Sequence, residues 1–142
     1  MKLSNFITTA TLLLLLAACS QSNEKKIAKD KEDYQEATRQ LEKKERTHPS
    51  QFLSLNYRDK HNMLGQTVVR GTLSNSAKIC TFQDVQLALS YYSKTGTLLL
   101  TTSETVYETV APGNSVKFKS KEFAPKGSDS VVIKVITAVV NK

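Results

Sequence analysis

The 142-residue sequence has no tryptophan, two cysteines, three prolines and five glycines. It contains no glycine-periodic stretch, no proline-rich stretch and no series of apolar spans, which excludes collagenous, disordered and multi-span membrane proteins. The remaining composition, 39% hydrophobic and 23% charged, is that of an ordinary globular protein. Once any processed segment is removed, this length supports one small domain.

Motifs for catalysis and for cofactor binding are also missing. The sequence has no Gly-x-Ser-x-Gly elbow, no phosphate-binding glycine loop and no carboxylates spaced as an acid–base pair. His48 and His61 stand 13 residues apart, without any Cys-x-x-Cys or His-x-x-x-His, so a metal site is not expected. The sequence therefore predicts a protein that is not an enzyme and that holds no metal or cofactor.

The N-terminus has the features of a secretory signal. Lys2 precedes a stretch from Phe6 to Ala18 that is apolar apart from three threonines. This run of about 13 residues is shorter than the roughly 20 that a helix needs to cross a bilayer. We therefore expect the run to be cleaved rather than kept as an anchor.

Leu16-Ala17-Ala18-Cys19 resembles the lipobox of bacterial lipoproteins. The resemblance implies a signal peptide over 1–18, a diacylglycerol of palmitate type on Cys19 and a third acyl chain on its new amino group. Because each buried methylene adds about 0.8 kcal/mol, these chains would anchor the protein firmly to a membrane. In lipoproteins of bacteria with two membranes, the residue after the acylated cysteine influences sorting. The resemblance therefore implies the outer membrane, because this residue is Ser20 and not Asp. The alternative is an ordinary signal peptide whose cleavage site happens to precede a cysteine.

Cys80 is then the cysteine left in the mature chain, so an internal disulfide is not possible. One alternative is a thiol that packs in the core as a small hydrophobe. The other is a reactive thiol in an oxidising compartment. The sequence leaves both open.

The segment 19–48 is predicted to be a charged helical stalk. It contains eight Lys or Arg, seven Asp or Glu, and no Gly or Pro. Its good helix formers predict a helix over about 24–46, with Asn23 as N-cap and an end before Pro49. About 23 residues at 1.5 Å each give a length of roughly 35 Å.

Ile27, Tyr34 and Leu41 recur at heptad spacing along this helix. The seam is thin, because Asp30 and Lys44 occupy heptad positions that should be apolar in a coiled coil. A solvated single stalk and a coiled coil are the two alternatives, and the oligomeric state stays open.

Residues 49–142 contain every glycine and every proline of the chain. Their period-two alternation predicts half-buried strands, and the glycines and prolines mark the turns. Pro112-Gly113 suits a type II turn. We expect a mainly β fold, a seven-stranded antiparallel sandwich, after the charged helix and the lipoprotein signal peptide. The expected strands centre on residues 53–57, 69–73, 85–91, 98–105, 105–110, 116–118 and 131–135.

Three short motifs follow one another in this region: Val69 to Ser76, a strand that ends in Tyr91-Tyr92 before Gly96, and Ala111-Pro112-Gly113 with Val116 and Phe118. They resemble the pattern of FxLYD-type domains. That pattern is a glycine strand that ends in Asn, a hydrophobic strand that closes on a Tyr-Asp pair with a following Gly, and a Pro-Gly turn before a strand with Phe. Ser93 stands where the family often has Asp. The resemblance covers residues 68–123 and implies an immunoglobulin-like envelope module without catalytic residues.

The net charge suggests a class of partner. The full chain carries +7 and the mature chain, without Lys2, carries +6. Lys117, Lys119 and Lys121 alternate, so on a strand they share one outward face, and Lys134 is a candidate fourth member. These lysines either keep a strand soluble and block edge pairing, or bind an anionic glycolipid, a phospholipid or an acidic envelope protein. Nucleic acid is not an expected partner in this compartment.

Two functions remain at this point. The first is a membrane-anchored envelope lipoprotein, a non-catalytic interaction module that docks onto another envelope component. The second is a lipid or small-ligand carrier or sensor that uses a groove in the sandwich. A carrier requires an unfilled apolar cavity between its sheets, whereas a docking module requires a filled core and a surface patch.

Replacing Cys19 with Ala is expected to block acylation, because the thiol that accepts the lipid is gone. The variant should stay unprocessed or appear in the soluble fraction, and mass spectrometry of the wild-type N-terminus should find a lipidated Cys19. The control Cys80→Ala should be lipidated normally. An unmodified Cys19 in the wild type, or cleavage at another residue, would contradict the prediction.

Overall fold

The computed structural model describes residues 5–61, 67–121 and 123–141, and describes the backbone alone for 5–22 and for His61. The expected lipidation site Cys19 and the neighbouring Ser20 therefore lie outside the described side chains. The chain divides into two compact units, Met1–Gln40 and Leu41–Lys142. The second unit contains the last turns of the helix together with all the strands.

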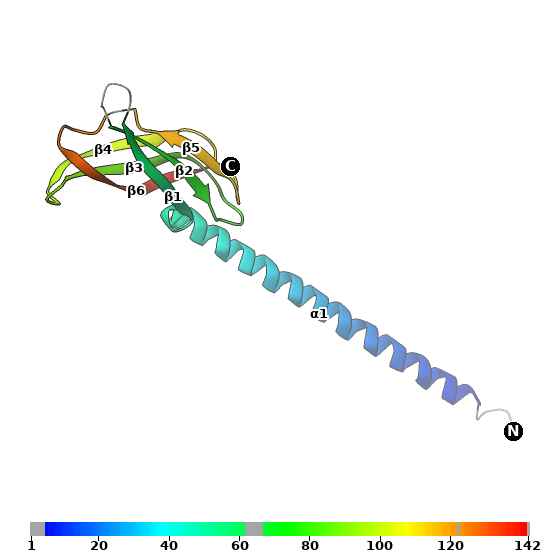
Figure 1. The fold of residues 1–142 in the computed structure, drawn as a ribbon. Coiled ribbons are helices and arrows are strands. Elements are labelled where there is room, and N and C mark those ends of the chain that lie inside the picture. The colour runs from blue at the N-terminus through cyan, green and yellow to red at the C-terminus, as the bar shows by residue number, and fades with distance from the viewer. Residues whose placement is uncertain (1–4, 62–66, 122, 142) are drawn as a thin grey trace. The chain divides into compact units, whose positions relative to one another are not determined.

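The helix α1 runs from Asn5 to Thr47 and is followed by the 3-10 helix η1, Pro49–Gln51 (Figure 1). The predicted end near residue 46 is confirmed. The predicted start is wrong, because Asn23 lies inside the helix and is not its N-cap. No Gly or Pro interrupts 5–47, and polar residues such as serine lower helix propensity by only a few tenths of a kcal/mol.

Two side chains of the heptad seam, Ile27 and Tyr34, are 67% and 73% exposed.

Within the part of the chain that the structure describes, no helix is both long and apolar enough to cross a bilayer.

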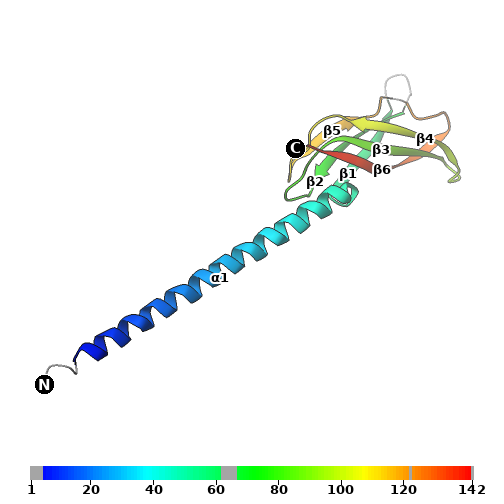
Figure 2. The ribbon, with the colours of Figure 1, turned by 180° about the vertical axis from the view of Figure 1, so that it is seen from behind.

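Within residues 5–61, 67–121 and 123–141, six strands form two antiparallel sheets of three strands each, not the seven strands predicted. Sheet A has the order β1-β2-β5 and sheet B the order β4-β3-β6. Figure 2 shows the strands of sheet B side by side. The bounds are β1 Leu53–His61, β2 Thr67–Asn75, β3 Thr81–Ser93, β4 Leu98–Val106, β5 Ser115–Lys119 and β6 Ser128–Asn141.

The predicted strand over 105–110 does not form. Val106 ends β4 opposite Val85, whereas Val110 makes an isolated bridge to Phe82. The two partners on β3 are three residues apart, whereas Val106 and Val110 are four residues apart. One regular antiparallel ladder therefore cannot include both pairs. The chain leaves sheet B at this irregularity and continues to sheet A.

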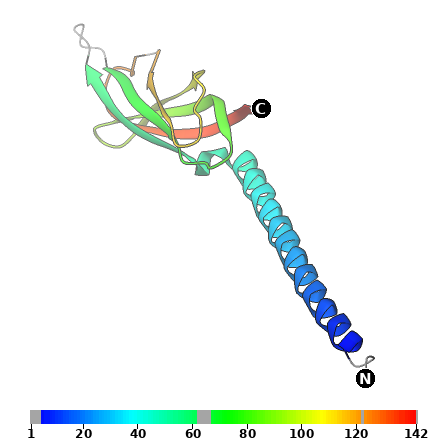
Figure 3. The same ribbon diagram turned by 90° about the vertical axis from the view of Figure 1, so that its right-hand side faces the viewer.

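Both sheets contribute side chains to one core. Figure 3 shows the backbone of the same strands, turned by 90° from the view of Figure 1. The predicted alternation is confirmed on β2 and β3, where Val69, Leu73, Leu87 and Leu89 are buried. The Tyr57 hydroxyl of sheet A accepts a hydrogen bond from the backbone of sheet B at 3.1 Å. The space between the sheets is therefore filled by side chains of both layers.

The side chain of Asn75 joins three segments at one end of the strands. It is 2% exposed, and its amide donates to the carbonyl groups of Cys80 and Val110 at 2.9 Å each. Its Oδ1 accepts from the backbone of Ala77 at 2.8 Å. The backbone of Asn75 bonds the turn 111–114 twice, at 2.9 Å. All these polar groups are thereby satisfied inside the protein.

The Pro112-Gly113 turn has the predicted geometry. Gly113 has a φ of +75°, and Asn114 donates to the carbonyl of Ala111 at 3.0 Å. A positive φ at the third residue of a type II turn requires glycine or asparagine. The turn directs β5 onto β2 in antiparallel pairing.

Replacing Asn75 with Ala should destabilise the fold by about 3 kcal/mol or more, because two carbonyl groups and one N–H lose their partner in the interior. Urea unfolding of the two proteins measures the difference. Asn56→Ala is the matched control, since Asn56 is exposed on β1, and it should change stability by at most about 0.5 kcal/mol. Equal stability losses in the two variants would refute the role given to Asn75.

Candidate functional site

Three cationic residues lie in one row across the outer face of sheet A. Arg58 on β1 is directly opposite Arg70 on β2, and Arg70 is directly opposite Lys119 on β5. All three are exposed, and each alternates with residues that face the core. Neighbouring strands are about 4.8 Å apart. We call Arg58, Arg70 and Lys119 the cation row.

A second row lies two residues further along the strands. It consists of Asn56, Thr72 and Lys117, which are paired in the same way. Two residues along a strand correspond to about 7 Å. The outer face of sheet A thus presents four cations and two neutral polar side chains within a small area.

Lys121 follows β5 and connects this face to the end of β4. Its backbone N–H donates to Glu104 Oε2 at 3.1 Å, and its Nζ lies 4.0 Å from Glu104 Oε1. The same Nζ lies 5.1 Å from the centre of the Tyr107 ring. Because the Lys121 side chain is 70% exposed, the ion pair contributes little to stability.

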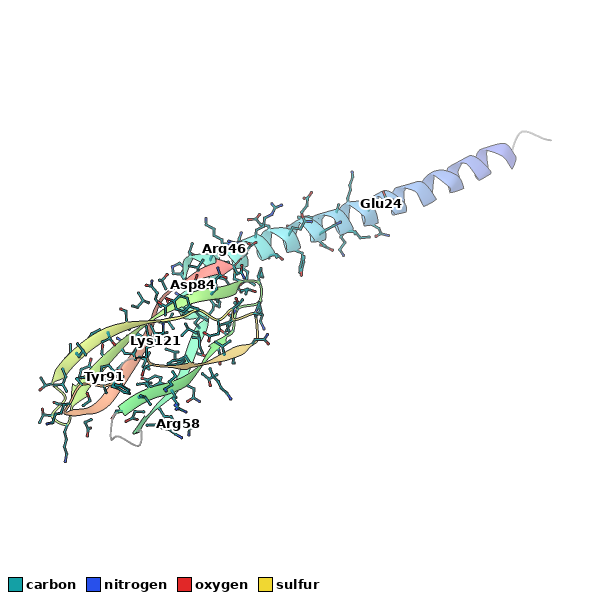
Figure 4. All side chains as sticks on the ribbon, turned by 90° about the horizontal axis from the view of Figure 1, so that it is seen from above. Glu24, Arg46, Arg58, Asp84, Tyr91 and Lys121 are labelled. Atoms are coloured by element: carbon teal, nitrogen blue, oxygen red, sulfur yellow. The ribbon has the colours of Figure 1, made fainter. Side chains whose placement is uncertain are left out.

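An open groove of about 930 Å³ collects these residues. We call it the cationic groove. Figure 4 labels Arg58 at the outer side of the β1–β2 pair and Lys121 on the segment after β5. The charged residues that line the groove are Arg58, Arg70, Lys117, Lys119 and Lys121 with Glu104 and Glu108. Five positive charges against two negative ones leave a net charge of +3.

The structure brings together three of the four lysines that the sequence singled out. Lys117, Lys119 and Lys121 line the same groove. Lys134 lies on β6 of sheet B and is exposed beside buried Ile133, so it faces away from the core on the other side of the two layers. The structure therefore does not bring Lys134 into the group.

Sequence reasoning missed Arg58 and Arg70. Each occupies a polar position in an alternating strand, which was a usable signal for exposure. Nothing in the sequence showed that β1, β2 and β5 are neighbours, so these arginines had no visible connection to the lysines.

The cation row is electrostatically unfavourable on its own. Like charges directly opposite each other on a sheet destabilise it by roughly 0.2–1 kcal/mol per pair. Among the residues that the structure describes, Arg58, Arg70, Lys117 and Lys119 form no ion pair. An anion placed over the row would therefore relieve repulsion as well as gain attraction.

A second polar cluster ties the end of α1 to the loop between β2 and β3. The Glu45 side chain is fully buried. Its carboxylate accepts backbone hydrogen bonds from Lys78 at 2.7 Å, Ile79 at 3.0 Å and Cys80 at 2.8 Å. Burial by itself raises the pKa of Glu45, but these three N–H donors outweigh it and hold the pKa below 4.5.

Cys80 packs in the core and is 3% exposed. Its Sγ lies 3.9 Å from the carbonyl oxygen of Glu42. Burial raises the pKa of the thiol, and the nearby Glu45 carboxylate raises it further. Since the thiolate is the reactive form, the structure favours the packed alternative for Cys80.

Comparisons with known proteins do not place the chain in a family. No protein-family model and no curated protein matches it. A solved structure described as the Salmonella enterica trimeric lipoprotein SadB aligns with 92% of this chain and 87% of its own, at 15% sequence identity and a TM-score of 0.41.

Replacing Glu45 with Gln should lower stability at pH 7 by about 2 kcal/mol, because hydrogen bonds to a charged acceptor are lost and the new amide opposes the backbone N–H groups. The folded pKa is lowered, so the ionised Glu45 stabilises the wild type above about pH 4.5. That contribution is lost as the pH falls through the folded pKa.

The stability gap between wild type and Glu45→Gln should therefore narrow as the pH decreases from 7 to 3, which urea unfolding at a series of pH values measures. Glu32→Gln is the control, because Glu32 is exposed on the same helix, and its gap should stay near zero. A gap for Glu45→Gln that is the same at every pH would contradict the assignment.

Proposed function

We propose that the protein is a bacterial envelope lipoprotein that docks onto an anionic component of the envelope through the cationic groove. The observation that carries this proposal is the cation row, in which three strands place Arg58, Arg70 and Lys119 directly opposite one another. A clustered field of one sign attracts the opposite charge and speeds its association. Lys117 and Lys121, which also line the groove, add positive charge next to the cation row.

The proposed anchor is the lipid on Cys19, and its support is the lipobox-like Leu16-Ala17-Ala18-Cys19. Ser20 favours the outer membrane over the inner one. The charged segment 19–48 is the proposed stalk and 49–142 the docking domain, with the Glu45 contacts fixing the last helical turns to that domain.

The proposed fold type of the docking domain is an immunoglobulin-like sandwich of the FxLYD kind. Residues that carry the resemblance have structural roles in this chain. A Cβ on Gly71 would lie 2.7 Å from the Phe118 ring, Asn75 joins three segments, and Gly113 has the positive φ of its turn.

The proposed role is non-catalytic binding and not ligand transport. The groove is lined by charges, whereas the space between the sheets is occupied by fully buried side chains such as Phe82, Leu87 and Tyr91. Both features support docking over a carrier.

Changing Lys117, Lys119 and Lys121 together to Gln should weaken binding to vesicles of anionic phospholipid by about ten-fold or more at low salt. Each lysine near an anionic surface contributes roughly 1 kcal/mol, and salt screens the attraction. Co-sedimentation of the unacylated chain 20–142 with vesicles measures the effect. Folding should be nearly unchanged, because exposed substitutions usually cost at most about 0.5 kcal/mol.

The matched control changes Lys94, Lys126 and Lys134 to Gln. These lysines are exposed and do not line the groove, and the control has the same net charge as the groove variant. It should keep most of the wild-type binding. Equal losses in the two triple variants would mean that total charge, and not the groove, drives binding.

A further inference from the structure

We propose that the Arg58–Arg70 pair, with Lys119 beside it, binds the phosphate monoester of a lipid headgroup. This inference rests on the proposed docking function and names its ligand. The lysines of the cationic groove supply long-range attraction, whereas the two arginines supply the specific contact.

The first step is the number and kind of donors in the row. A guanidinium is planar and donates two parallel hydrogen bonds to one anion, whereas an ammonium acts as a point charge. Two such groups on neighbouring strands, with Lys119 on the third, place three cations within about 10 Å. All three side chains donate and none accepts.

The second step is the match to the anion. A phosphate monoester has three strong acceptor oxygens and a charge of about −1.5 to −2 near pH 7. A carboxylate or a phosphodiester has one negative charge and two such oxygens. Three cations in one row, without a described carboxylate paired to Arg58 or Arg70, therefore suit the monoester better.

The third step is the rigidity of the backbone that holds Arg70. Gly71 is paired with Phe118 on β5, and a Cβ at this position would lie 2.7 Å from the Phe118 ring and 2.7 Å from the Asn56 carbonyl oxygen. The strands are thus packed as closely as glycine allows. The spacing between Arg58, Arg70 and Lys119 is fixed by three paired strands instead of by a loop, which limits the ordering cost of binding.

The fourth step points to a lipid rather than to a soluble phosphate. Tyr107 lines the groove and is 65% exposed, and its ring is in contact with the Lys121 ammonium group. Tyrosine is enriched at the level of lipid headgroups, where its ring meets apolar chains and its hydroxyl meets water. The groove is open, and the row lies on the outer face of a sheet, where a membrane surface has access.

The experiment uses the full chain purified in micelles of an uncharged detergent. Isothermal titration calorimetry measures binding of phosphatidic acid, a monoester, and of phosphatidylglycerol, a diester, with the two lipids matched by total charge. The wild type should bind phosphatidic acid about five-fold or more tighter than phosphatidylglycerol. The double variant Arg58→Lys with Arg70→Lys conserves the charge and removes both planar guanidinium groups. It should reduce this preference to less than about two-fold.

Lys134→Arg is the control, because it also conserves charge and lies on sheet B, and it should keep the full preference. Thermal unfolding of each variant verifies that it is folded. If the double arginine variant has a lowered melting temperature, Arg70→Lys alone replaces it.

The outcomes separate this inference from the proposed function. Equal wild-type binding of both lipids would overturn the monoester assignment and leave docking through the groove intact. If the wild type binds neither lipid and does not bind polyglutamate, both proposals are overturned. If free glycerol 3-phosphate binds as tightly as phosphatidic acid, the lipid assignment is overturned. If polyglutamate binds more tightly than phosphatidic acid, the lipid assignment is also overturned and the partner is an acidic protein.

Discussion

The buried amide of Asn75 is the interaction on which the arrangement of the strands depends. It holds the carbonyl groups of Cys80 and Val110 and the N–H of Ala77 at one point, where the chain passes between the two sheets. The adjoining turn 111–114 bonds the Asn75 backbone and begins the pairing of β5 with β2. A shift of that pairing by one residue would turn every side chain of β5 to the opposite face.

The loop after Asn75 shows how two side chains replace a missing strand partner. Four consecutive N–H groups, from residue 77 to residue 80, are satisfied by the Asn75 amide oxygen and the Glu45 carboxylate. Ala77 and Cys80 are buried, and an unpaired N–H group at such a position would cost roughly 1–3 kcal/mol of stability. The end of α1 is therefore part of the domain's hydrogen bonding, and a stalk that only spaced the domain from a membrane would not need a buried carboxylate there.

The cationic groove contains unfavourable repulsion between like charges, in contrast to the well-packed core and the hydrogen-bonded buried polar groups. The core is apolar and the buried Asn75 and Glu45 are hydrogen-bonded, yet the outer face of sheet A sets Arg58, Arg70 and Lys119 against one another. Natural sequences concentrate such departures at functional sites, where stability is exchanged for binding. The repulsion within the cation row, more than the total charge of the chain, is the reason for proposing sheet A as the docking surface.

The sequence by itself determined the features that depend on neighbouring residues: the end of α1 at Thr47, the alternation in β2 and β3, and the type II turn at Gly113. It did not reveal that 105–110 contains no separate strand, that Glu45 is buried, or that Arg58 and Arg70 join Lys119. Those features were decided by tertiary structure, because strand order and register arise from hydrogen bonds between segments far apart in the chain. Alternation indicates which side chains point outward, and only the pairing of strands indicates which of them lie together.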